Sequence, residues 1–281
     1  MDEKSLLARI IKATGDLPTM PHIANLVIEK LSAPTTTPQE IHTIISKDQS
    51  LAARVLRIAN SPFYGYPRTI TRLTDAIVIM GFNSIRSLVL TSVFQDLFKS
   101  FGLTEKLLWE HSLVCASISQ RVAKAAGFKK TEEAFLVGLM HDIGKVILYM
   151  NVPDKMTDII QEVYNTQETS FIQMEENLFG FNHADVGRAV AAKWNFAKEI
   201  EEAIGCHHAP EKAVILPSLS YIVHLANNYC HKLEIGPIRQ PDLNPMELVS
   251  AKALKFNQQM MNRLSEDVST MLESQQSSAL F

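Results

Sequence analysis

A histidine and an aspartate stand side by side in a stretch of the chain that otherwise suits a protein core. The stretch is Gly138–Lys145, where His141 and Asp142 interrupt a run of apolar residues. Burying such a pair in a core costs free energy unless another group binds it. The fold must therefore supply partners for His141 and Asp142, and the rest of the sequence can be searched for them.

Further histidines occur at intervals that suit ligands on separate helices. They are His111 upstream, His183 downstream, and the doublet His207-His208. Neutral imidazoles with a carboxylate bind divalent transition metals such as Fe, Mn, Ni, Co or Zn, and an aspartate can bridge two ions. The pattern therefore predicts a metal centre. A metal ion lowers the pKa of bound water and neutralises a phosphate ester, which is the usual route to phosphoester hydrolysis.

Lys145 is the candidate for contact with such a substrate. It follows His141 by four residues, so on a continuous helix the two side chains would be neighbours. If the centre is active, we expect Asp142 and Lys145 to be its catalytic residues.

Several of the candidate ligands also have a simpler explanation. His111 alone is typical of a hydrogen-bonded core histidine, and the His141-Asp142 pair can be a buried ion pair that fixes helix register. His183 can be a surface residue in the first turn of its helix, and His208 a capping group that faces water. The ordered set of companions favours the metal centre.

The spacing of apolar residues predicts an all-α protein, because three- and four-residue steps recur along the chain and alternating strand patterns are almost absent. The N-cap candidates are Thr37, Asp48, Thr104, Ser170 and Asn182. We expect one helix to open at Thr131, carry His141 and Asp142, and end at Pro153. We also expect Gly81 to end a helix, and His207 to line the helix that begins near Ile200.

Composition limits the possible classes of protein. A chain of 281 residues, 46% of them hydrophobic, is typical of one large or two modest globular domains. A net charge of −3 gives no basic field for broad nucleic-acid binding. We find no signal peptide and no apolar run of spanning length, so we expect a cytoplasmic protein without a membrane anchor.

The ordered ligand set resembles that of the HD superfamily of metal-dependent phosphohydrolases. The similarity covers residues 104–232 and rests on the histidines and aspartate named above. In that superfamily a last aspartate usually follows an alanine on a late helix, and Asn227 occupies the matching position here. A neutral amide is a weaker ligand and cannot act as a charged base, so this departure counts against catalysis while metal binding remains compatible.

The N-terminal part resembles a more specific family, the HDOD family. Four ordered segments carry the resemblance: Leu17–Pro21, Ile45–Leu51, Arg57–Gly65 and Ala76–Gly81. The resemblance covers residues 15–232 and implies a bacterial protein with an HD-domain-like helical bundle, preceded by a packed N-terminal helical subdomain. We expect an N-terminal helical part at residues 1–102 and an HD-like part at 103–233. Residues 234–281 are expected to form a proline-containing connection, a last helix and a frayed tail.

The HDOD resemblance implies a signalling or regulatory role, since the family often lacks a complete ligand set and has no generally established catalytic activity. We expect a regulatory protein that binds a partner protein or a small nucleotide or phosphate ligand. The expected metal ligands are His111, His141, Asp142, His183, His207, His208 and Asn227. The alternative is an active metal-dependent phosphohydrolase acting on a phosphate ester or nucleotide, and a third reading is a site kept only for stability.

Overall fold

The structure is a computed structural model that describes residues 8–10, 20, 22–31, 33, 35–60, 69–98, 103–166 and 170–276. Within these ranges the regular structure is helical and no strand occurs, which confirms the all-α prediction. Most of the segment Leu17–Pro21 and the end of the segment Arg57–Gly65, which contribute to the HDOD resemblance, lie outside the described residues. The chain divides into two compact units.

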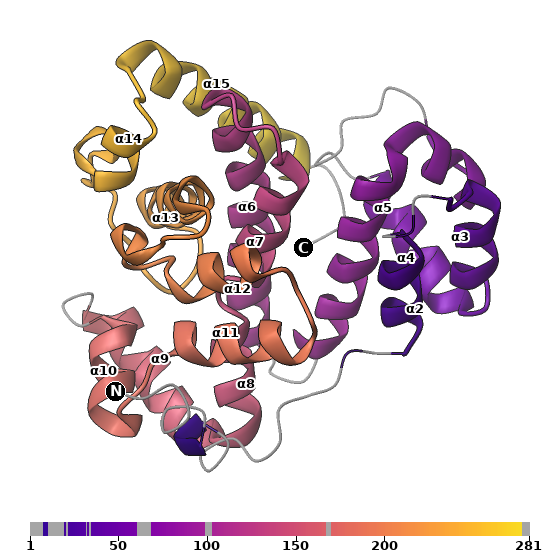
Figure 1. Cartoon of the computed structure of the whole chain (residues 1–281). Helices are drawn as coiled ribbons and strands as arrows, with labels where there is room; N and C mark the ends of the chain where they lie inside the picture. The colour runs from indigo at the N-terminus through magenta and orange to yellow at the C-terminus, as the bar shows by residue number, and fades with distance from the viewer. Residues whose placement is uncertain are drawn as a thin grey trace. The chain divides into compact units, whose positions relative to one another are not determined.

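One unit comprises residues 20–100 and 263–281. Its helices before residue 100 are α2 (His22–Leu31), α3 (Pro38–Ile45), α4 (Gln49–Ala59) and α5 (Leu73–Phe98). The long helix α5 packs against each of the other three, as Figure 1 shows. Its buried residues, among them Ile77, Ile85 and Leu88, form the centre of this small core.

Two of the predicted helix starts lie in this unit and both are confirmed. Thr37 caps α3 through a complete capping box, in which its hydroxyl accepts a hydrogen bond from the backbone N–H of Glu40 and the Glu40 carboxylate accepts one from the N–H of Thr37. Asp48 caps α4 by accepting from the N–H of Leu51. Capping side chains satisfy N–H groups that the first helical turn leaves free, so these boundaries are encoded locally.

Gly81 interrupts α5 with a φ of 77°, a backbone conformation that glycine adopts without steric cost. The predicted stop at Gly81 is therefore a kink between two helices that continue into each other. The segment Leu73–Val93 is apolar and long enough to pass a test for membrane spans, which corrects our expectation that no such run is present. In its most apolar window 61% of the residues are buried against protein, as in the core helix of a small domain.

The other unit comprises residues 1–19 and 101–262. Its longer helices are α6 (Leu103–Ala125), α7 (Thr131–Met140), α8 (Ile143–Asn151), α9 (Pro153–Thr166), α10 (Phe171–Phe179), α11 (His183–Lys193), α12 (Lys198–Gly205) and α13 (Pro217–Lys232). Short helices η1 (Pro210–Lys212), η2 (Pro245–Glu247) and α14 (Val249–Ala253) follow. The residues of α15 (Gln258–Gln276) belong to this unit up to Asn262 and to the other unit from Arg263. In Figure 1, α6 lies alongside α7, and the contacts of α13 with α6 and of α11 with α8 and α12 complete the packing.

The chain does not form the single helix that we expected between Thr131 and Pro153. Helix α7 ends at Met140, His141 and Asp142 form a turn, and α8 begins at Ile143. Likewise α12 ends at Gly205, so His207 lies in the turn after that helix and does not line it. His141, Asp142 and His207 therefore lie just beyond helix ends and not within helices.

Candidate metal centre

The structure brings six of the predicted site residues into one cluster. His111 lies within α6, His141 and Asp142 in the turn between α7 and α8, His183 at the start of α11, and His207 and His208 in the turn after α12. Five of the six are buried, and only His208 is partly exposed. Residues from four separate segments of the chain therefore meet inside the unit.

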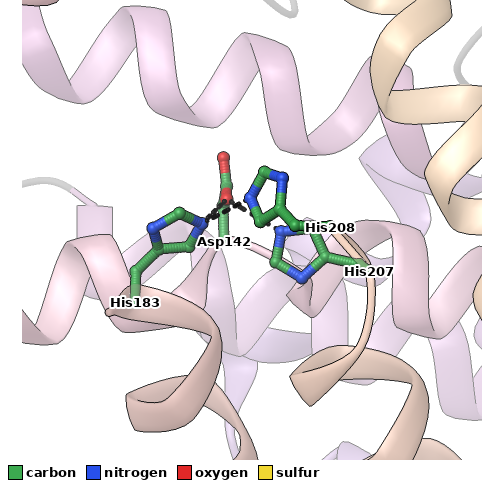
Figure 2. A group of neighbouring side chains, drawn as sticks. All are labelled: Asp142, His183, His207 and His208. Carbon is green, nitrogen blue, oxygen red and sulfur yellow. Dashed lines mark hydrogen bonds and ion pairs between the residues drawn. The ribbon is translucent and has the colours of Figure 1, made fainter. Parts of the chain in front are cut away.

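The Asp142 carboxylate is the centre of the cluster. Its Oδ1 lies 3.3 Å from His183 Nε2 and 3.7 Å from His207 Nε2. Its Oδ2 lies 3.4 Å from His141 Nε2 and 3.6 Å from His111 Nε2. Asp142 thus belongs to two possible ligand groups, one formed with His183, His207 and His208 and the other with His111 and His141. Figure 2 shows the rings of the first group arranged around the carboxylate.

Three of the imidazoles are held by backbone carbonyl groups. Nδ1 of His111 lies 2.9 Å from the carbonyl oxygen of Ile235, and Nδ1 of His141 and of His207 each lie 2.7 Å from the carbonyl of the third residue before them. A carbonyl oxygen only accepts hydrogen bonds, so Nδ1 carries the proton in each ring. In the neutral ring Nε2 therefore presents a lone pair toward Asp142, as metal-binding histidines do.

His183 is held in the same way by a carboxylate. Oε2 of Glu175, on α10, lies 2.6 Å from His183 Nδ1 and accepts a second hydrogen bond of 2.8 Å from the His183 backbone N–H. The Glu175 side chain is fully buried. Such a carboxylate fixes the tautomer of a ligand histidine and raises its basicity.

Two pairs of Nε2 atoms face each other across the cluster. His111 and His141 are 3.2 Å apart at these atoms, and His183 and His208 are 2.9 Å apart. Two lone pairs at such distances repel unless a proton or a metal cation lies between them. Burial opposes charge on His141, but the nearby Asp142 carboxylate raises its pKa to about 9. Burial lowers the pKa of His111, so a proton on His141 can be shared with His111. A proton or a metal cation between the facing Nε2 atoms would relieve their repulsion.

Unsatisfied polar atoms support the same conclusion. Asp142 Oδ1 and His207 Nε2 are buried and accept no hydrogen bond from the part of the chain that the structure describes. Buried polar atoms are rarely left without a partner, because desolvation costs about 1–3 kcal/mol for each. A divalent transition metal would satisfy both atoms, and imidazole with carboxylate is a suitable donor set for it. The residues present therefore fit a metal ion.

The two remaining candidates occupy different environments. Lys145 is buried, and its Nζ lies 2.7 Å from Asp142 Oδ2. The expectation that it neighbours His141 on one helix is wrong, because the chain turns between them. Asn227 is buried on α13, and its Oδ1 has no hydrogen-bond partner among the described residues. The roles of Asn227 as a metal ligand and of Lys145 as a catalytic group stay predictions.

Sequence reasoning missed Glu175 and His231. Glu175 follows the buried Phe171 by four residues on α10, and an acidic residue on the buried face of a helix was the available signal. His231 lies one helical turn after Asn227 on α13. It is buried, and its ring stacks on His111 with centroids 5.7 Å apart.

A family model and a similar solved structure both identify the same family. A family model described as the HDOD domain matches residues 17–210. A crystal structure of an HDOD domain protein of unknown function from Geobacter sulfurreducens is 26% identical, with a TM-score of 0.83 and coverage of 100% of both chains. An uncharacterized protein from Treponema pallidum is 22% identical over 212 residues. That match covers 74% of this chain and only 41% of the relative, so the chain spans about two fifths of that protein.

Two further structures share the fold at lower identity. A Shewanella amazonensis protein, provisionally named a metal-dependent phosphohydrolase, is 19% identical with a TM-score of 0.69 and covers 97% of each chain. A Marinobacter aquaeolei protein, provisionally named a signal transduction protein, is 17% identical with a TM-score of 0.79. It covers 98% of this chain and 64% of that one. At these identities the likeness concerns the fold alone.

Proposed function

Since the chain belongs to the HDOD domain family, we propose that it is a bacterial, cytoplasmic regulatory protein that binds a divalent transition metal and acts by binding a partner or ligand. The metal centre, formed by Asp142 and the five clustered histidines, ties together four segments of one unit. The partner is a regulatory protein or a small nucleotide or phosphate ligand.

The closed character of the centre is the observation that carries this proposal. Asp142 and four of the five histidines have at most 2% of their surface exposed. Catalytic metal sites keep a coordination position open to substrate, whereas structural sites are enclosed by protein ligands. Lys145 Nζ also lies against Asp142 Oδ2, a position that a catalytic ion or water would otherwise share. These features favour a bound ion that stabilises and shapes the unit over one that turns over substrate.

An ion bound in this way can act as a signal. A ligand that binds only the folded state stabilises it by about 2.7 kcal/mol at a concentration one hundred times its Kd. Because the clustered side chains of α6, the α7–α8 turn, α11 and the turn after α12 contact one another around Asp142, this stabilisation extends to all four segments. Surfaces carried by these segments would then respond to metal supply.

Metal content tests the proposal directly. Untagged protein purified without chelators should contain a divalent transition metal by plasma mass spectrometry, and Asp142→Ala should lose it. Asp158→Ala, which removes an exposed carboxylate from α9, is the matched control and should retain the ion. Folded protein that stays metal-free after incubation with manganese, iron, nickel and zinc salts would contradict the proposal.

A second candidate function is metal-dependent hydrolysis of a phosphate ester or nucleotide. The partial exposure of His208 favours it, since this ring gives the cluster one edge near solvent. A metal ion held by the Asp142 and histidine side chains would supply Lewis-acid charge and a water of lowered pKa. Asp142 and the histidines would hold the ion, and Lys145 would have to leave Asp142 to meet a phosphate.

Turnover separates the two functions. A regulator retains partner or ligand binding without hydrolysis, whereas an enzyme shows metal-dependent release of phosphate or nucleotide product that Asp142→Ala abolishes. A panel of aryl phosphate mono- and diesters and nucleotides, assayed with metal-loaded protein, distinguishes them. Sustained metal-dependent turnover would overturn the regulatory proposal and establish the alternative.

A further inference from the structure

Lys145 brings a positive charge against one side of the Asp142 carboxylate. Its Nζ lies 2.7 Å from Asp142 Oδ2, and its side chain is only 4% exposed. The same ammonium faces the ring of Phe171, 4.4 Å from the ring centroid, which is within the range of a cation–π contact. The backbone N–H of Lys145 also donates to the carbonyl of Asp142, so the residue is fixed at both ends.

The two oxygens of Asp142 therefore differ. Oδ2 accepts a charge-assisted hydrogen bond from Lys145, whereas Oδ1 has no hydrogen-bond partner among the described residues. The other unsatisfied atom of the cluster, His207 Nε2, faces Oδ1 at 3.7 Å. Within the six-residue cluster, both unsatisfied atoms thus belong to the group formed by Asp142, His183, His207 and His208. Outside the cluster, Asn227 Oδ1 is also buried without a hydrogen-bond partner among the described residues. The group formed with His111 and His141 already contains one cation, the Lys145 ammonium.

The ligand atoms that each group offers also favour a metal ion on the Oδ1 side of Asp142. The Oδ1 group offers three imidazoles and a carboxylate oxygen, which is enough to complete a tetrahedral site. The Oδ2 group offers two imidazoles and an oxygen that the ammonium already contacts. With neutral imidazoles, the carboxylates of Asp142 and Glu175 against the Lys145 ammonium leave one net negative charge. One divalent ion brings this sum to one net positive charge, and a second ion would bring it to three, which is far costlier to bury.

We propose that the centre binds a single divalent ion, on the Oδ1 side of Asp142 with His183, His207 and His208, and that the Lys145 ammonium takes the place of a second ion at Oδ2. This inference rests on the metal binding proposed above. It specifies the number of ions bound and the side of the Asp142 carboxylate on which the ion lies. Lys145 is then an internal cation that keeps a potential two-ion centre at one ion.

Replacing the ammonium by an uncharged group of similar length tests this role. In Lys145→Met the side chain retains its bulk but Oδ2 loses its cation. Wild-type protein reconstituted with excess Mn²⁺ or Ni²⁺ and then desalted should contain about one ion per chain, and Lys145→Met about two. Lys212→Met removes an exposed ammonium on η1 and is the matched control. Two ions in the wild type, or one ion in both proteins, would overturn the assignment to Lys145.

A second comparison does not depend on how Lys145→Met folds. His207→Ala removes a ligand on the Oδ1 side and should lose the ion, whereas His111→Ala removes a ligand on the Oδ2 side and should retain it. Circular dichroism verifies that each variant is folded. Loss of the ion in His111→Ala with retention in His207→Ala would overturn the inference alone, because metal binding itself would persist. Absence of metal from every folded protein would remove the proposed metal function as well.

Discussion

Glu175 lies outside the ligand cluster but affects the pKa and the metal affinity of one candidate ligand, His183. Its Oε2 accepts hydrogen bonds from both Nδ1 and the backbone N–H of His183, inside the protein. Burial opposes charge on the His183 ring, but the Glu175 carboxylate raises the pKa of His183. The same interaction makes Nε2 of His183 a stronger donor to a metal ion.

We predict that Glu175→Gln weakens metal binding while the fold is retained. The amide keeps the shape of the side chain but removes the negative charge that polarises His183. Loss of such a partner typically costs about 10–100-fold in metal affinity. Competition with a chromogenic chelator measures this affinity. Glu162→Gln, an exposed site on α9, is the control, and equal affinities in the two variants would show that Glu175 does not tune the centre.

The sequence predicted the residues of the cluster better than it predicted their hydrogen-bond and packing partners. The positions of His111, His183 and the doublet were visible in the sequence because imidazoles are rare and their order is distinctive. Glu175 and His231 were not recognised, since a lone glutamate or histidine on a helix is usually solvated. Only the packing of α10 and α13 reveals that these two side chains are buried against His183 and His111.

At the scale of helices, the close approach of α8 and α11 positions the centre. Gly144 begins this contact: a Cβ added there would lie 1.9 Å from the backbone carbonyl oxygen of His183 and 3.0 Å from the backbone N of Gly187. These are backbone atoms, which cannot move aside without shifting α11. The distance between Asp142 and His183 therefore depends on glycine, which has no side chain, at position 144.

We predict that Gly144→Ala destabilises the protein by about 3 kcal/mol, as overpacking of a tight core contact does. It should also reduce metal retention, because α11 carries His183 away from Asp142. Urea unfolding followed by circular dichroism measures the first effect and metal analysis the second. Met150→Ala, at an exposed position of α8, should change the free energy of unfolding by no more than about 0.5 kcal/mol. A variant with wild-type stability would show that α8 and α11 have room to separate.

Helix boundaries were predictable where local chemistry sets them. The capping boxes at Thr37 and Ser170 and the cap at Asn182 are confirmed, since each side chain bonds to N–H groups of its own first turn. The break at His141 and Asp142 was not predictable, because no proline marks it. There the contacts of Asp142 with His111 and His183, from distant segments, outweigh helix propensity, which is a weak preference.

At the scale of the molecule, the centre lies in one of the two units. All six clustered residues belong to the unit of residues 1–19 and 101–262, and none of the described helices α2, α3 and α4 contributes a ligand. Metal binding should therefore stabilise the two units unequally. This expectation does not depend on how the units are arranged.

Hydrogen exchange read by mass spectrometry should reveal this inequality. At a metal concentration one hundred times the Kd, amides of α6, α7, α11 and α12 that exchange by unfolding of their unit should slow about 100-fold. Those of α2, α3 and α4 should change little. In Asp142→Ala the metal should have no effect on either set. Equal slowing in both units of the wild-type protein would contradict a local effect.

The order of the ligands along the chain has a consequence for how the protein is made. His111 is the first of the clustered residues to be synthesised and His208 the last, with α7 to α12 between them. Contacts between such distant residues form only after the intervening chain is available. The ion therefore cannot guide the folding of the early helices during translation and is loaded only after His208 has been synthesised. In a metal-starved cell, newly made copies would remain less stable than older copies that are already loaded.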